Sequence, residues 1–236
     1  MGLRRLLDIC DKYDIKVSLP INGLTCEYYP ELVKECHRRG HELVAPGWDQ
    51  GERLYMLTRE QERENIRKTI EAILKVTGER PTGWSSPGVR STDNTPELIA
   101  EAGLLYHCDY HDDGMPYPLK VGNKILIEFP HQYTINDHRM LEHVTRQEFF
   151  EKFTDEFDYR YRIGRETPTM MNVITHAYVS SRIPLIDTFE RIVAYAKSHK
   201  EVWFTWRGDV AAWARKCYLE SGWEGRLPPP DKKLPH

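Results

Sequence analysis

Short apolar runs alternate along this chain with longer stretches in which apolar residues recur at helical spacing. The first such stretch begins at Leu3 and predicts a helix that ends near Asp14. A longer helix is predicted after Thr58, because Thr58 and Gln61 form a capping box and Gly78 follows the last apolar turn. The same criteria predict helices over residues 30–39, 94–102, 145–161, 184–198 and 209–219.

The short apolar runs predict strands, several of which are closed by proline or glycine. They lie at residues 16–20, 41–45, 80–85, 104–106, 124–129, 170–175 and 202–205, and the run at 170–175 is expected to be buried. Strands that alternate with helices favour a parallel sheet closed or nearly closed by helices, and therefore an α/β fold. Functional residues of such folds lie at the carboxyl ends of the strands, so the candidates are sought there.

Composition limits the classes of protein to which the chain can belong. With 236 residues, 40% of them hydrophobic, it has the size of one domain. We expect this domain over residues 1–220, followed by a C-terminal tail over 221–236. Lys and Arg number 33 and Asp and Glu 36, which gives no reason to expect a nucleic acid partner. No stretch approaches the ~20 apolar residues of a membrane span, so no membrane partner is expected either.

The cysteines and the first residues of the chain indicate the cellular compartment of the protein. Five cysteines, without a Cys-x-x-Cys pair, argue for a reducing environment, and we expect them to be buried packing residues. Asp8 interrupts the apolar start in a way that a signal peptide does not tolerate. Both features predict a cytoplasmic protein.

Several motifs in one order resemble the polysaccharide deacetylase (NodB-homology) superfamily. They are Gly40-His41-Glu42, Arg80-Pro81-Thr82-Gly83-Trp84, Asn94-Thr95-Pro96-Glu97-Leu98 and the stretches 106–117 and 176–190. Residues 112–117 and 136–139 resemble more narrowly the branch that holds metal-independent allantoinases and cyclic imide hydrolases. The resemblance implies a distorted, incomplete (β/α) barrel.

Three departures from the family's pattern concern its metal site. The family opens with a strand that carries acidic residues for the metal and the general base, whereas here a helix starts at Leu3. A His-x-x-x-His-type pair is replaced by Pro46 to Gln50, and an arginine after Gly-Trp is replaced by Ser85-Ser86. We therefore expect neither a zinc ion nor another cofactor.

A substitute metal site is conceivable in the segment after the strand at 104–106. His107, Asp109 and His111 alternate, so on a strand their side chains would point to one face. The other interpretation is a polar strand end and loop, in which Asp109 and Asp113 act on the substrate. Asp109 and Asp113 are accordingly candidate catalytic residues.

His176 is the main candidate catalytic residue. It follows the run at 170–175, at the carboxyl end of a predicted strand. The matching histidine of the family is a general acid that protonates the leaving group, and histidine is suited to proton transfer near neutral pH. The alternative is a hydrogen-bonded histidine of the core.

The candidate substrate-binding residues also follow strands, or match the family's loops. They are Trp84, His107, Asn136, Asp137, Arg139 and Arg182. Arginine and asparagine suit a ureide or imide, which offers paired C=O and N–H groups. A position in the core is an equal alternative for Trp84. A solvated loop is an equal alternative for residues 136–139. His41, at a strand start, is expected to be structural.

These features predict a hydrolase of non-peptide C–N bonds that acts on a small molecule, with His176 as general acid. An N-deacetylase of an acetylated sugar or amine is the alternative within enzymes. A catalytically silent relative that binds a ligand or a partner is the alternative from another class. The open sheet edge beside residues 16–19 further predicts a homo-oligomer.

Overall fold

A computed structural model of the chain describes residues 2–140 and 143–222, and of Arg139 and Met140 the backbone alone. The chain divides into two compact units, each built from segments that are distant in the sequence. Of the described residues, the first unit combines those up to Ile15 with Gln132–Phe204, and the second combines Lys16–His131 with those from Thr205 onward. A single domain over residues 1–220 stays a prediction, and the predicted tail lies, from residue 223, outside the described residues.

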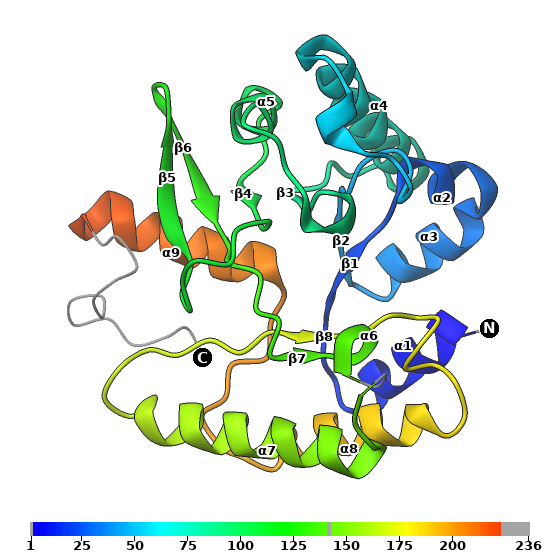
Figure 1. The fold of residues 1–236 in the computed structure, drawn as a ribbon, viewed down its shortest axis with the longest axis vertical. Helices are drawn as coiled ribbons and strands as arrows, with labels where there is room; N and C mark the ends of the chain where they lie inside the picture. The colour runs from blue at the N-terminus through cyan, green and yellow to red at the C-terminus, as the bar shows by residue number, and fades with distance from the viewer. Residues whose placement is uncertain (1, 141–142, 223–236) are drawn as a thin grey trace. The chain divides into compact units, whose positions relative to one another are not determined.

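The first unit is mostly helical (Figure 1). Its elements are α1 (Gly2–Lys12), β7 (Ile135–Asn136), α6 (Asp137–Met140), α7 (Arg146–Ile163), β8 (Val173–Ile174) and α8 (Leu185–Lys197). The capping box predicted for Thr58 and Gln61 has a counterpart here, since Thr145 and Glu148 exchange side-chain-to-backbone bonds at the start of α7. Helices α7 and α8 lie side by side over β7, and their contact is the core of the unit. The core consists of Ile135, Phe149, Phe153, Phe157, Ile192 and Ala196.

The second unit holds most of the strands. It begins with β1 (Ser18–Pro20), α2 (Gly23–Tyr28), α3 (Pro30–Arg38), β2 (Glu42–Val44), the short helix η1 (Leu54–Met56) and α4 (Arg59–Thr77). It continues with β3 (Gly83–Trp84), η2 (Pro87–Val89), α5 (Thr95–Glu101), β4 (Tyr106–His107), β5 (Tyr117–Val121), β6 (Lys124–Glu128) and α9 (Arg207–Ser221). The predicted capping box of Thr58 and Gln61 is confirmed, and Gly78 ends α4 at a φ of 79°.

The sheets of the second unit are mixed. Strand β1 pairs in parallel with β2, and a parallel bridge between Ala45 and Trp84 links β2 to β3. The following sheet has the order β3-β4-β6-β5, in which only the β5–β6 hairpin is antiparallel. The α/β class is confirmed, whereas the described residues form separate sheets and no closed barrel. Among them β1 pairs only with β2, and association of a second copy there stays a prediction.

Two predicted strands differ from the structure. Residues 202–205 form no strand, because Val202 and Phe204 pack their side chains against the core of the first unit without joining a ladder. The run at 170–175 is a strand only over Val173–Ile174 and is half-buried rather than buried. Helix α2 and strand β5 were not predicted, since both are short and lack a clear apolar period.

Single residues of the second unit agree better with their predicted places. His41 is 3% exposed, and its Nδ1 accepts a bond from the backbone N–H of Val17, as expected of a structural histidine. The five cysteines, all within the described residues, are buried thiols, which confirms them as packing residues. Within the described residues, none of the helices combines the length and the apolar character that crossing a bilayer requires.

Candidate active site

Parallel pairing of two short strands builds the site of the first unit. Asn136 of β7 lies opposite Ile174 of β8, so the two strands end at the same edge. Asp137 follows β7 directly and His176 follows β8 by two residues. The pairing therefore brings together two candidates that are far apart in the sequence.

Asp137 and His176 form a tight pair. The Nδ1 of His176 lies 2.6 Å from Oδ1 of Asp137, and the backbone N–H of His176 donates to Oδ2 at 2.8 Å. Ser180 donates its hydroxyl to the same Oδ2 at 2.6 Å. Asp137 is 0% exposed, so its carboxylate is a fixed acceptor that orients the imidazole. The side chain of His176 keeps 33% of its surface exposed, which leaves Nε2 as the nitrogen for exchange with a substrate.

Two further rings surround His176. The ring centroids of His138 and Tyr178 lie 5.5 and 5.4 Å from that of His176. The hydroxyl of Tyr178 and Nδ1 of His138 are 3.0 Å apart. Asn136 is buried, and its Oδ1 accepts from the backbone N–H of His138. The predicted loop 136–139 is thus an ordered segment beside the candidate acid.

The structure describes the two arginines predicted in this unit to different extents. Arg182 is exposed, and its backbone N–H closes a turn with Val179. Arg139 lies in α6, and its side chain is outside the described part of the structure. Substrate binding by either residue stays a prediction. Ser180, which the sequence analysis missed, carried no signal beyond its distance of four residues from His176.

The second unit contains a buried cluster of charged side chains at the ends of β4 and β6. The parallel register places His107 beside Glu128, and Nδ1 of His107 lies 2.5 Å from Oε2 of Glu128. Oδ2 of Asp109 lies 3.0 Å from Nε2 of the same imidazole. None of these three residues is more than 4% exposed. Burial by itself lowers the pKa of His107, but the two carboxylates outweigh it and raise that pKa to about 9.

The outer oxygens of this cluster are held by backbone N–H groups. Oδ1 of Asp109 accepts from the N–H of Ser86 at 2.8 Å, and Oε1 of Glu128 accepts from that of Tyr110 at 3.0 Å. Glu128 was not predicted, although a charged residue that ends an apolar strand is itself a signal. His107 is thus buried between two carboxylates that favour its charged form, a position unlike that expected for a substrate-binding side chain.

Three other sequence candidates are not members of this cluster, although Trp84 pairs with His107 in the register of β3 and β4. Trp84 is 0% exposed and donates from Nε1 to Oγ of Ser86, which favours the core alternative over a pocket wall. Asp113 is exposed, and its Oδ1 accepts from the N–H groups of the next two residues, as in an Asx turn. The Nδ1 of His111 lies 2.9 Å from the carbonyl oxygen of His131.

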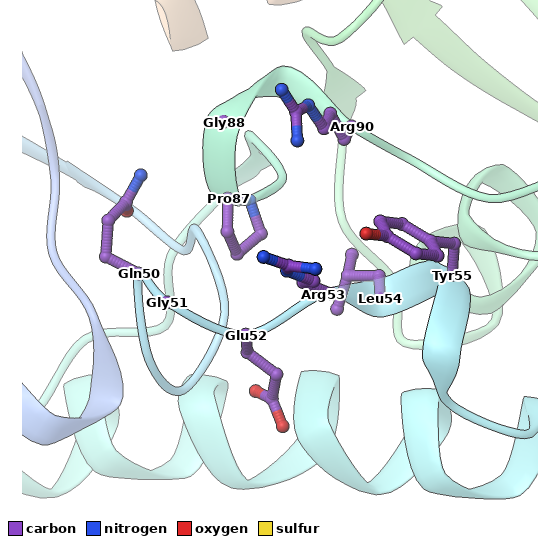
Figure 2. A pocket seen from close by; sticks show the side chains of 9 residues that line it. All are labelled: Gln50, Gly51, Glu52, Arg53, Leu54, Tyr55, Pro87, Gly88 and Arg90. Carbon is purple, nitrogen blue, oxygen red and sulfur yellow. The ribbon is translucent and has the colours of Figure 1, made fainter.

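A hollow of about 220 Å³ opens in the loops that follow β2 and β3 (Figure 2). Below we call it the Arg53–Arg90 hollow. It is lined by Gln50, Gly51, Glu52, Arg53, Leu54, Tyr55, Pro87, Gly88 and Arg90. None of these residues was a sequence candidate. The rule that function follows strand ends nevertheless pointed to both loops.

The described residues do not provide a ligand set for the metal that the family pattern implies. Where that pattern has histidines, Pro46 is buried, and Asp49 accepts from the N–H of Gly51 in a turn. Both ring nitrogens of His107 face carboxylates, so it does not join Asp109 and His111 in a three-ligand site. Within residues 2–140 and 143–222 no three His, Cys, Asp or Glu side chains are arranged to hold a metal ion.

Known proteins resemble the chain in sequence and in fold. A family model described as polysaccharide deacetylase matches residues 2–107. A peptidoglycan deacetylase of Helicobacter pylori is 26% identical over 240 residues, which cover 87% of this chain and 81% of the relative. The crystal structure of PuuE allantoinase is 30% identical with a TM-score of 0.84, and the match covers 94% of this chain and 74% of that chain.

A CE4 family pseudoenzyme from Bacillus anthracis shares only the fold. It is 13% identical with a TM-score of 0.61, over 89% of this chain and 60% of its own. The motifs of the sequence, the identity to the allantoinase over most of both chains and the shared fold agree with one another. The chain is therefore a member of the polysaccharide deacetylase (NodB-homology) family.

Proposed function

We propose that this protein hydrolyses a non-peptide C–N bond of a small cyclic amide, imide or ureide. The observation that carries the proposal is the pair of Asp137 and His176, in which a buried carboxylate fixes Nδ1 and leaves Nε2 accessible. The chain resembles an allantoinase and a peptidoglycan deacetylase, which supports the hydrolytic class of the reaction.

In the proposed reaction, water adds to the carbonyl carbon and gives up a proton to the solvent, and the C–N bond breaks to leave a carboxylate. The leaving nitrogen then needs a proton, and the imidazolium of His176 donates it from Nε2. Asp137 stabilises the imidazolium and fixes the ring orientation through the bonds to Nδ1 and to the backbone N–H. The roles of Asp109, Asp113, Asn136 and Arg182 stay proposals, and no step is assigned to a metal.

Turnover of a panel of compounds by wild type and by His176→Gln tests the proposal. The panel consists of allantoin, succinimide, a dihydropyrimidine and an N-acetylated amino sugar. We expect activity on a cyclic compound, and a kcat about 10²–10⁴-fold lower for His176→Gln at unchanged folding. The loss should shrink on a substrate whose leaving nitrogen carries an electron-withdrawing group, because such a nitrogen needs less protonation.

His37→Gln is the matched control, since His37 lies on the surface of α3. Turnover of the acetylated sugar alone would replace the proposal by an N-deacetylase, for which the Helicobacter pylori relative is the supporting observation. Wild-type inactivity on the whole panel would favour a silent relative. Equal turnover by wild type and His176→Gln would remove His176 from the mechanism.

A further inference from the structure

The Arg53–Arg90 hollow has two cationic groups that face no anion. Within the described part of the chain, neither the Arg53 nor the Arg90 guanidinium has an ion pair or a hydrogen bond, whereas arginines of the neighbouring helix α4 do. Arg59 lies 2.7 Å from Glu97, and Arg67 lies 2.6 Å from Glu64. The two arginines of the hollow are therefore exceptions among their neighbours.

The carboxylate at the hollow is turned away from it. Figure 2 shows the side chain of Glu52 pointing toward α4, while the guanidinium of Arg53 points toward Pro87, away from that helix. The side-chain amide of Asn65 on α4 donates to Glu52, which keeps this carboxylate in place. With two arginines and one glutamate among its lining residues, the hollow carries a net positive charge, together with the phenol of Tyr55.

The backbone that presents Arg90 has an uncommon conformation. Gly88 and Val89 have φ values of 65° and 57°, in the left-handed region. Glycine adopts this region without strain, but a β-branched residue such as Val89 is an outlier there. Such strain is concentrated at functional sites of proteins. It supports a role for the loop that ends in Arg90.

The same loop is tied to the buried cluster of the second unit. Ser86, which precedes Pro87 of the hollow, donates its backbone N–H to Asp109 at 2.8 Å. The floor of the hollow includes Leu54, which is 1% exposed. The volume of the hollow, about 220 Å³, is below the range of about 300–1,000 Å³ typical of sites for drug-sized ligands, so the hollow suits a small molecule.

We propose that Arg53 and Arg90 bind the carboxylate of a small molecule in this hollow. A guanidinium offers planar, fixed N–H donors that match a carboxylate and keeps its charge at all physiological pH values. The proposal rests on the proposed function only in identifying that molecule, since opening of a cyclic imide or ureide produces a carboxylate. Binding itself does not require turnover.

Calorimetric titration with succinamate and with succinamide tests the proposal. Succinamate is the ring-opened form of succinimide, and succinamide is its neutral counterpart of nearly the same size. We expect succinamate to bind at least tenfold more tightly to the wild type, and its affinity to fall with rising salt concentration. Arg53→Gln and Arg90→Gln should each weaken succinamate binding about tenfold and leave succinamide unchanged.

Arg67→Gln on the surface of α4 is the control and should bind succinamate like the wild type. Equal affinity for the two compounds, or full affinity in the double variant Arg53→Gln/Arg90→Gln, would overturn the proposal. So would an affinity that drops between about pH 6 and pH 8, because an arginine site keeps its charge there and a histidine site does not. Binding without turnover on the panel would refute the hydrolase and leave the carboxylate site standing.

Discussion

Asp137 accepts three hydrogen bonds from the segment after β8, two of them from His176 alone: one from its ring and one from its backbone N–H. The carboxylate therefore fixes both the position of the main chain of His176 and the orientation of the imidazole. A mutation of Asp137 should for this reason affect the orientation of the candidate acid before it affects the fold of the unit.

Asp137→Asn should lower kcat about 10²–10⁴-fold on any substrate that the wild type hydrolyses. The amide lacks the negative charge that stabilises the imidazolium and permits the other tautomer of the ring. Ser180→Ala is the matched control, because it removes one bond to the same carboxylate and leaves its contacts with His176 intact. Ser180→Ala should lower kcat by less than tenfold. Steady-state kinetics on folded variants are the measurement. An Asp137→Asn enzyme with full kcat would contradict the role of Asp137 in orienting and stabilising the imidazolium of His176.

The stability of the protein should fall between about pH 6.5 and pH 9. The folded-state pKa of His107, about 9, lies above the unfolded value of about 6.5. The stabilisation by its charged form is thus fully present below pH 6.5 and is lost as the pH rises through 9. The shift corresponds to roughly 3 kcal/mol. Urea unfolding across this range measures the loss.

Glu128→Gln tests the source of this pH dependence. The substitution removes one of the two carboxylates that raise the pKa of His107 and keeps the size of the side chain. The free energy of unfolding of the variant should therefore change less between pH 6.5 and pH 9 than that of the wild type, and the difference between the two cancels the titrating groups that both proteins share. Parallel pH profiles would show that the contact with Glu128 does not control the titration.

Gly83→Ala should destabilise the second unit strongly. A Cβ at Gly83 would overlap the ring of Tyr106 on the neighbouring strand, and this ring is itself 0% exposed. Overpacking of this kind costs about 1–3 kcal/mol or more, because neither strand can move away freely. Gly114→Ala is the control, since a Cβ there meets no atom within 4 Å. Similar unfolding midpoints for the two variants would contradict the packing at Gly83.

The purified protein should hold no stoichiometric zinc. Pro46 and Gln50 stand where the family pattern has ligands, and both ring nitrogens of His107 face carboxylates. Elemental analysis after dialysis is the measurement. About one tightly bound metal per chain would contradict the prediction and would direct attention back to His107, Asp109 and His111.

The sequence predicted most helices, because their start and stop signals are local. Thr58 with Gln61 and Thr145 with Glu148 cap their helices as their spacing requires. It also predicted the family, and it named His176 as a catalytic and Asp137 as a substrate-binding candidate, but the contact between the two appears only in the structure. Strand 202–205 was predicted wrongly, because an apolar run does not show whether it joins a sheet or packs on helices.

The tertiary structure alone decided which contacts arise where strands that are distant in the sequence pair. Composition and local pattern determined the α/β class, the cysteines as buried residues and His176 as a strand-end histidine. Only the register of β4 against β6 placed Glu128 beside His107, and only the folded loops brought Arg53 and Arg90 to one hollow. The physical reason is that burial and proximity change the charge state and the role of a side chain, and neither is a property of the sequence neighbourhood.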